Sequence, residues 1–92
     1  MAKIIIPTPL RKFTNGQSTF ESDGTTVQAV VDSLVIKNAT LGQQILDGTG
    51  NIRSFIRVYV GDEDINELEG ADTVVDDNSV ISIVPAIAGG IS

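Results

Sequence analysis

The feature that most constrains this chain is one amphipathic helical stretch set between two pairs of strand-like segments. Apolar side chains recur there at i, i+3, i+4, i+7 and i+8: Val27, Val30, Val31, Leu34 and Val35. This spacing places them on one face of an α-helix. Thr25, with Gln28 three residues later, fits an N-cap with a capping box, and Asn38 fits the helix end. Valine is a poor helix former, but amphipathic packing stabilises protein helices more than propensity does, so we predict a helix.

Two strand-like segments precede this helix. The first, Ala2–Thr8, contains three consecutive isoleucines and is expected to stop at the prolines Pro7 and Pro9. Asn15-Gly16 is a strong turn signal, and Ser18–Ser22 is expected to return as the second strand. The sequence therefore predicts a hairpin whose connection, from about residue 10 to residue 17, is a loop.

A short second helix and two more strands are predicted after the main helix. Thr40 and Gln43 repeat the capping-box spacing before a short apolar stretch. Phe55–Val60 alternates as a half-buried strand does, and residues 61–64 are expected to turn it toward a short edge segment beginning at Ile65. Ser79–Pro85 has apolar residues on both faces, which predicts a strand buried on both sides. The order ββα(α)ββ indicates an α+β fold in which the helix covers one face of a mixed sheet of four to five strands.

Length and composition exclude several classes of function. A chain of 92 residues is long enough for one domain, which we assign to residues 1–85, and it contains no cysteine and no histidine. Disulfides, thiolate catalysis and the usual zinc sites are therefore excluded, as is the commonest general base. No membrane-spanning run and no signal peptide are recognisable, so we expect a soluble cytoplasmic protein.

The charge of the chain is distributed unevenly along the sequence. Residues 1–57 contain six basic and four acidic residues, whereas residues 58–92 contain eight acidic and no basic ones, giving a net charge of −6. An acidic half repels phosphate backbones, so no nucleic-acid partner is expected. The acidic residues either keep a small protein soluble or orient it toward a basic protein surface, and the sequence leaves both explanations open.

The acidic segment after the third predicted strand is a weak candidate for a metal site. Asp62, Asp64 and Asn66 have the 1-3-5 spacing of a calcium-binding loop. Glu67 stands where such a loop needs glycine, and Thr73 stands where it needs glutamate. We therefore predict a solvated acidic turn, no metal ligands and no bound cofactor.

Several strand residues have a predicted role in packing. The aromatic residues Phe20, Phe55 and Tyr59 are expected to be at least partly buried. Arg53 and Arg57 are expected either to lie on a solvated strand face or to contact an acidic surface of a partner. Four aliphatic residues are candidates either for the core beneath the helix or for a hydrophobic docking patch. They are Val58, Val60, Ile81 and Ile83. The sequence does not decide between the two.

The segment that follows Pro85 has a different character. Residues 86–92 read Ala-Ile-Ala-Gly-Gly-Ile-Ser, which are small and uncharged, and we predict a flexible C-terminal tail. The adjacent Gly89 and Gly90 have no side chains, so they can enter a channel that any Cβ would block. A carboxylate at this position would be open to activation by a partner enzyme. The alternative is a flexible end that carries no chemistry.

Two segments of this sequence resemble the ThiS/MoaD family of ubiquitin-like sulfur carriers. They are Phe55–Ile65, reading FIRVYVGDEDI, and Asp76–Gly90, reading DDNSVISIVPAIAGG. Within the family, the likeness is nearest to the CysO-type branch that serves cysteine biosynthesis. Ile6-Pro7-Thr8 and the chain length also resemble that branch. The resemblance covers nearly the whole chain and implies a β-grasp fold.

The resemblance also implies a mechanism and a set of partners. An E1-like enzyme of the MoeB/ThiF type would use ATP to adenylate the carboxylate of Gly90, and sulfur would then replace the adenylate to give a thiocarboxylate. A cysteine synthase would accept the sulfur, and a JAMM-type metalloprotease would release the product. Ala88, Gly89 and Gly90 would thread into partner active sites. The chain would itself be a protein cosubstrate and no enzyme.

The sequence departs from the family pattern at its end. Ile91 and Ser92 follow Gly90, so the terminal carboxylate belongs to Ser92. The carrier role therefore requires cleavage between Gly90 and Ile91, for which the metalloprotease is a candidate. Other roles stay open: a MoaD-like small subunit for molybdopterin synthesis, a ThiS-like thiamin carrier, a ubiquitin-like protein modifier, or a plain β-grasp interaction domain.

Overall fold

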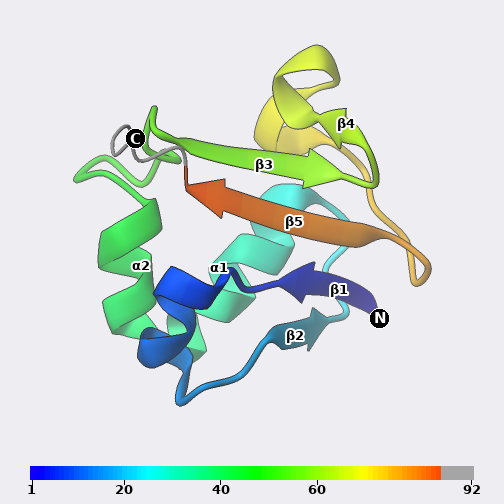
Figure 1. Ribbon diagram of the computed structural model, residues 1–92. Coiled ribbons are helices and arrows are strands. Elements are labelled where there is room, and N and C mark those ends of the chain that lie inside the picture. The colour runs from blue at the N-terminus through cyan, green and yellow to red at the C-terminus, as the bar shows by residue number, and fades with distance from the viewer. Residues whose placement is uncertain (86–92) are drawn as a thin grey trace.

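The computed structural model describes residues 1–85, and the predictions made for residues 86–92 lie outside this range. Within it the chain forms a five-stranded sheet in the order β2-β1-β5-β3-β4 (Figure 1). The strands are β1 (Ala2–Ile5), β2 (Thr19–Ser22), β3 (Ile56–Val60), β4 (Glu63–Asp64) and β5 (Val80–Pro85). The α-helices are α1 (Val27–Lys37) and α2 (Ala39–Ile45), and the 3₁₀ helices are η1 (Thr8–Thr14), η2 (Ile65–Glu67) and η3 (Gly70–Asp72).

The centre of the sheet is a parallel pair made by the first and last strands. β1 and β5 run side by side with Ile4 opposite Ile81, while β2, β3 and β4 pair antiparallel to their neighbours. A parallel pair requires a long crossover, and here that crossover contains both α-helices. This arrangement is the ubiquitin-like β-grasp, so the predicted fold and its mixed sheet are confirmed.

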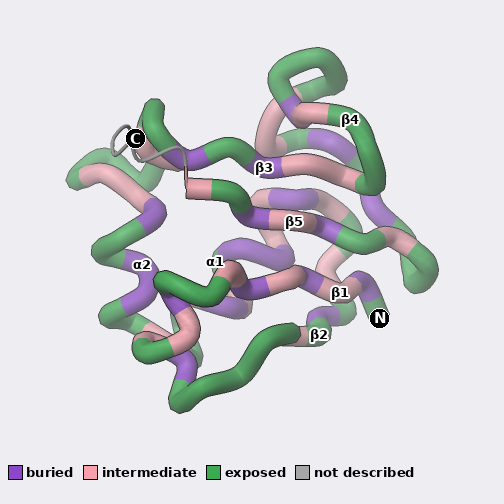
Figure 2. Tube along the Cα trace, viewed as in Figure 1, coloured by how far each residue is buried: buried purple, intermediate pink, exposed green. Residues whose placement is uncertain are grey.

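The core lies between the inner face of the sheet and α1, as the burial colours of Figure 2 show. Val27, Val30, Val31 and Leu34 of α1 are at most 2 % exposed. They meet inward side chains of the sheet such as Ile4, Ile81, Ile83 and Val58, which are at most 3 % exposed. The helical period read from the sequence therefore identified the packing face correctly, and burial of this apolar area is the main stabilising term of the fold.

The capping residue of α1 differs from the prediction by one position. Thr26, and not Thr25, is the N-cap, and its Oγ1 accepts a hydrogen bond from the backbone N–H of Ala29 at 3.1 Å. Thr26 also forms an isolated antiparallel bridge with Val74. This bridge fixes an extended conformation at Thr26, which is the conformation an N-cap residue needs. The other helix end, Asn38, is confirmed.

The predicted loop between the first two strands is in fact largely helical. η1 spans Thr8–Thr14. Pro9, near its start, has a fixed φ and no N–H, and this is tolerated because the first N–H groups of a helix have no partner within the helix. Leu10 and Thr14 are buried on its inner side, and the Nε of Arg11 donates to the carbonyl of Ile6 at 3.0 Å. The turn signal was nevertheless correct, because Asn15 at φ 57° ends η1 in the left-handed region.

The last two strands correct two further expectations. β5 is buried on one face only: Ile81 and Ile83 point into the core, whereas Val80 and Val84 are exposed. No helix covers the outer face of the sheet in the described residues (Figure 1), so the apolar residues there stay accessible to solvent. Glu63 and Asp64, predicted as part of a turn, form β4, and the segment beginning at Ile65 is the 3₁₀ helix η2 instead of an edge strand.

The two α-helices approach each other closely at a glycine. A Cβ placed on Gly42 of α2 would lie 2.6 Å from the Cγ1 of Val35 on α1, well inside the distance of ordinary contact. Glycine therefore lets α2 pack against α1 at this point. In residues 1–85, no helix is long and apolar enough to cross a membrane.

Candidate functional site at the end of β5

The residues predicted to carry the chemistry lie beyond the part of the chain that the structure describes. Ala88, Gly89, Gly90 and Ile91 all fall in residues 86–92. The structure does show where this segment begins: Pro85 is the last residue of β5 and pairs with Ile56, the first residue of β3. Pro85 is therefore anchored at one end of the sheet, and the surface around it is the part of the described structure that lies next to the C-terminal segment.

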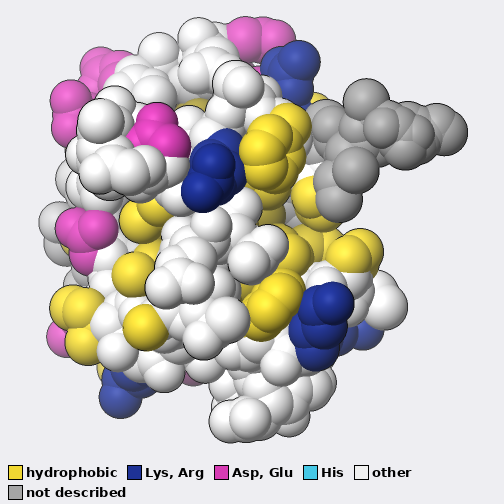
Figure 3. Space-filling view, turned by 90° about the vertical axis from the view of Figure 1, so that its left-hand side faces the viewer, with side chains coloured by type: hydrophobic (Ala, Val, Ile, Leu, Met, Phe, Trp, Pro, Cys, Tyr) yellow, Lys and Arg dark blue, Asp and Glu magenta, His cyan; other side chains and the backbone are white. Residues whose placement is uncertain are grey.

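The outer face of the sheet presents an apolar surface next to Pro85. Val84 and Phe55 are each 44 % exposed, and Arg57 stands opposite Val84 in the antiparallel register of β3 and β5. We call these three residues the β5-end surface. Figure 3 views the molecule from the side on which α2 and the end of β5 lie, and it shows hydrophobic side chains reaching the surface among Lys and Arg side chains.

This surface was only partly visible in the sequence. Phe55 was predicted to be at least partly buried, but it is exposed, in the turn that immediately precedes β3. Phe20 and Tyr59 are half-buried, as predicted. The four aliphatic residues left open between core and docking patch belong to the core side: Val58, Ile81 and Ile83 are buried and Val60 packs against them. The exposure of Val84 was not predicted, although its position next to Ile83 in a strand indicates that the two side chains lie on opposite faces of the sheet.

Arg57 is held by a neighbouring strand. Its Nη1 lies 3.4 Å from the Oδ2 of Asp64 on β4, and Arg57 is half-exposed while Asp64 is largely covered. An exposed pair of this kind contributes about 0–1 kcal/mol to stability. The Oδ1 of Asp64 also accepts a hydrogen bond from the N–H of Asn66 at 2.9 Å, which caps η2. Asp64 therefore serves local structure, and residues 1–85 contain no cluster of three acidic, His or Cys ligands.

The loop between α2 and β3 is a second ordered element near this end of the sheet. The Oδ1 of Asp47 accepts hydrogen bonds from the hydroxyl of Thr49 at 2.6 Å, from the N–H of Thr49 at 2.8 Å and from the N–H of Asn51 at 3.1 Å. These bonds, the one from the Thr49 hydroxyl first, favour the charged carboxylate and hold the pKa of Asp47 below its usual value. The glycine-rich segment 47–51 is therefore a structured turn.

Comparisons with known proteins identify the family. The ThiS family matches residues 4–90, nearly the whole chain. The sulfur carrier protein CysO of Mycobacterium tuberculosis is 34 % identical over 89 residues, which cover 95 % of this chain and 96 % of that protein. The chain belongs to the ThiS family. Its members are small ubiquitin-like sulfur carriers and not enzymes, so the predicted resemblance and the predicted absence of an enzyme role are confirmed.

Solved structures agree with this assignment. CysO in the crystal structure of the Amycolatopsis orientalis BexX/CysO complex superposes with a TM-score of 0.88 at 33 % identity, covering 98 % of this chain and 100 % of that chain. The small archaeal modifier protein 1 of Methanosarcina acetivorans superposes with a TM-score of 0.83 at 26 % identity, covering 97 % of this chain and 95 % of that one. The first neighbour was solved with a protein partner, in keeping with a family of carriers.

Proposed function

We propose that this ThiS-family chain transports sulfur as a thiocarboxylate on Gly90, after removal of Ile91 and Ser92. The observation that most supports the proposal is the extent of the family match, which ends at Gly90 and leaves the last two residues outside. A carrier needs its reactive carboxylate on the residue that the family places last. Cleavage of the Gly90–Ile91 peptide bond would expose that group.

The proposed chemistry uses the chain as a substrate. A carboxylate oxygen of Gly90 attacks the α-phosphorus of ATP in an E1-like enzyme, and pyrophosphate leaves. A sulfur nucleophile then attacks the carbonyl carbon of the acyl adenylate, AMP leaves, and the thiocarboxylate remains. Activation is necessary because a carboxylate is a poor electrophile, whereas the adenylate has a good leaving group. No side chain of the carrier is needed as acid or base, which agrees with a sequence that lacks His and Cys.

The geometry supports delivery of Gly90 to a partner. Gly90 is the fifth residue after Pro85, and an extended chain spans about 3.3–3.6 Å per residue, so Gly90 can reach about 17 Å from the end of β5. An enzyme that acts on Gly90 must then lie against this end of the molecule. The β5-end surface offers it two exposed apolar side chains and one guanidinium. Ala88, Gly89 and Gly90 would enter the enzyme's active site, where a Cβ on either glycine would obstruct a narrow channel.

The most direct pathway for the sulfur is cysteine biosynthesis in the cytoplasm. The support is the similarity to proteins named CysO over 95 % of the chain. In that role the partners are a MoeB/ThiF-type adenylating enzyme, a cysteine synthase that accepts the sulfur and a JAMM-type metalloprotease. A second candidate is a protein modifier, supported by the structural similarity to small archaeal modifier protein 1. The molybdopterin and thiamin branches share the same first step.

Reconstitution with two versions of the chain tests the proposal. The chain ending at Gly90 and the chain ending at Ser92 are each incubated with an E1-like enzyme, ATP and sulfide, and the intact mass is recorded. We expect one oxygen to be replaced by sulfur in the shorter chain alone. Gly90→Ala in the shorter chain is expected to abolish the exchange while leaving the folded core unchanged by circular dichroism. Equal exchange in both chains, or none in either, would reject Gly90 as the site.

A further inference from the structure

The fold places most of the chain's charge at two opposite ends of the sheet. β1 and β5 run parallel, so Ile5 and Pro85 lie toward the same end, which we call the β5 end. The connection between Val60 and Val80 leaves and rejoins the sheet at the other end, and it contains eight of the twelve acidic residues. In Figure 1 the β5 end, with η1 and α2, lies on the left, and the turn between β3 and β4 lies on the right. The acidic half of the sequence therefore forms one acidic end of the molecule.

Four basic residues lie toward the β5 end. Arg11 and Lys12 belong to η1, which follows β1, and Arg53 lies in the loop that leads into β3, whose first residue pairs with the last of β5. α1 begins beside the acidic connection, where its N-cap residue forms a bridge, and it ends at Lys37. Within residues 1–85, none of these four side chains forms an ion pair. The end of the molecule opposite the acidic connection is therefore basic.

An apolar groove adjoins this basic end where α1 meets α2. Its volume is ≈ 320 Å³. Four of the residues that line it are Val35, Ala39, Leu46 and Arg53. Ile36, next to Val35 in α1, is 82 % exposed, the highest value among the large hydrophobic side chains of residues 1–85. We call Ile36, Lys37, Arg53 and this groove the α1–α2 surface. Exposed apolar side chains that are bordered by polar ones mark contact sites with other proteins.

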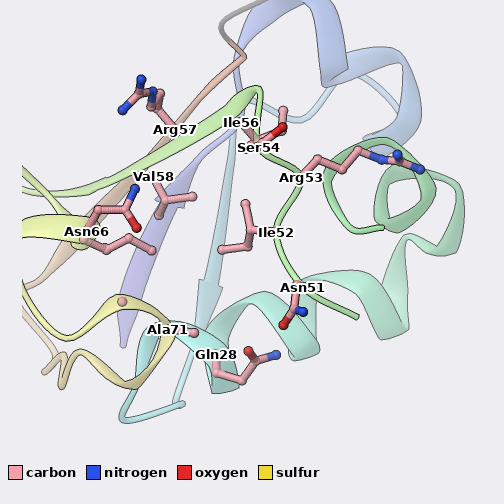
Figure 4. A pocket seen from close by; sticks show the side chains of 12 residues that line it. Gln28, Asn51, Ile52, Arg53, Ser54, Ile56, Arg57, Val58, Asn66 and Ala71 are labelled. Carbon is pink, nitrogen blue, oxygen red and sulfur yellow. The ribbon is translucent and has the colours of Figure 1, made fainter. Parts of the chain in front are cut away.

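Arg53 is held on the α2 side of its loop. Its Nη2 donates to the carbonyl of Gln43 at 3.2 Å, which uses one of the five donors of a guanidinium. A cleft of ≈ 470 Å³ lies on the other side of the loop, beneath β3, and Ile52 points into it, whereas Arg53 extends toward α2 (Figure 4). Asp47 also borders the α1–α2 groove, but its Oδ1 accepts hydrogen bonds from its own loop, and Arg53 is the smallest of the causes that lower its pKa. Within the described residues, the guanidinium therefore remains available to a partner.

We propose that the α1–α2 surface docks on an acidic surface of the E1-like enzyme, with Ile36 covered by an apolar side chain of that enzyme. The inference rests on the proposed carrier function and specifies the chemistry of its partner. At physiological ionic strength charges are screened beyond about 8 Å, so an approaching enzyme senses the end that faces it more than the net charge of −6. An acidic enzyme surface attracts the basic end and repels the acidic one, so the molecule arrives with the end of β5 leading. A basic enzyme surface would attract the acidic end and turn the end of β5 away.

Association rates test the role of the charge. Stopped-flow binding of the full chain to the E1-like enzyme is recorded at about 0.01 M and about 0.15 M salt. At the lower concentration Lys37→Gln should reduce the association rate constant about two- to fivefold, as expected for the loss of one charge pair about 4 Å apart in water. Lys3→Gln is the matched control, because it changes the net charge equally but Lys3 lies opposite Val80, at the acidic end, so its rate should not fall. The effect of Lys37→Gln should shrink at the higher salt concentration.

A second matched pair tests the apolar contact. Ile36→Ser should raise the dissociation rate constant about tenfold at either salt concentration, because covering an aliphatic side chain that is 82 % exposed stabilises a complex by about that factor. Val74→Ser, at a valine that is 73 % exposed in the acidic connection, should leave dissociation unchanged. Circular dichroism of all four variants provides the control for folding.

The outcomes separate this proposal from the carrier function itself. Equal association rates for Lys37→Gln and Lys3→Gln at low salt, or equal dissociation rates for Ile36→Ser and Val74→Ser, would overturn the docking proposal. Faster association of Lys37→Gln would indicate a basic enzyme surface and would overturn it as well. Sulfur exchange at Gly90, recorded by intact mass, does not require this surface, so its persistence in all four variants leaves the carrier function in place when docking on the α1–α2 surface fails.

Discussion

Two valines on the outer face of β5 provide a matched test of where the activating partner docks. Val84 and Val80 lie on the same strand and the same face, and they are 44 % and 40 % exposed. They differ in position: Val84 adjoins Pro85, whereas Val80 begins the strand and pairs with Lys3. We predict that Val84→Ser weakens recognition by the E1-like enzyme and that Val80→Ser does not.

The size of the effect follows from the exposed area that a partner would cover. Full burial of an aliphatic side chain stabilises by about 1.5–3 kcal/mol, so covering the exposed 44 % of Val84 contributes about 0.7–1.3 kcal/mol. Since about 1.4 kcal/mol corresponds to a factor of ten, Val84→Ser should raise the KM for the carrier about three- to tenfold. The kcat should stay unchanged, because the residue does not touch the reacting carboxylate.

The assay is ATP–pyrophosphate exchange by the E1-like enzyme at varied concentrations of a carrier that ends at Gly90. Urea unfolding of both variants provides the control for folding, and the exposed position of both valines predicts little change in stability. Equal KM values for the two variants would refute docking at the β5-end surface. A fall in kcat with an unchanged KM for Val84→Ser would refute the reasoning as well.

Other predictions concern the fold around this surface. Gly42→Ala should lower the free energy of unfolding by about 1 kcal/mol, because the close approach to α1 outweighs the gain in helix propensity, while Gly48→Ala, with open space around its Cβ, should not destabilise. Leu34→Ala, at a fully buried position, should cost about 2–5 kcal/mol in denaturant unfolding. NMR titration should show the pKa of Asp47 lowered from its ordinary value, because the carboxylate accepts hydrogen bonds from Thr49. The stabilisation from these bonds is present above the unfolded-state pKa, so amide protection in the loop should be lost as the pH falls through the folded-state pKa.

The order of elements could be predicted because the periodicities in this sequence are strong. The spacing of Val27, Val30 and Leu34 defined one helix face, and the alternation of Phe55–Val60 defined one strand. The parallel pairing of β1 with β5 could not be obtained from periodicity, because register between distant strands is set by tertiary packing. That pairing was expected only from the resemblance to a known family. The structure then confirmed it through the opposition of Ile4 and Ile81.

The errors in the sequence-based prediction have local physical causes. The segment after Pro7 was expected to be a loop, yet proline tolerates a helix start, and the buried Leu10 and Thr14 favour η1. The burial of Val84 and Phe55 was overestimated because hydrophobicity alone does not reveal that one face of a sheet lacks a cover. The cleft beneath β3 could not be predicted, since its lining residues come from five separate segments of the chain.

The central claim is tested most directly by the intact mass of the protein purified from its native cells. The account predicts a mass lower than that of the translated sequence by the residues Ile91 and Ser92, with a fraction in which one oxygen is replaced by sulfur. A full-length mass that persists after incubation with ATP, sulfide and extract of the same cells would contradict it.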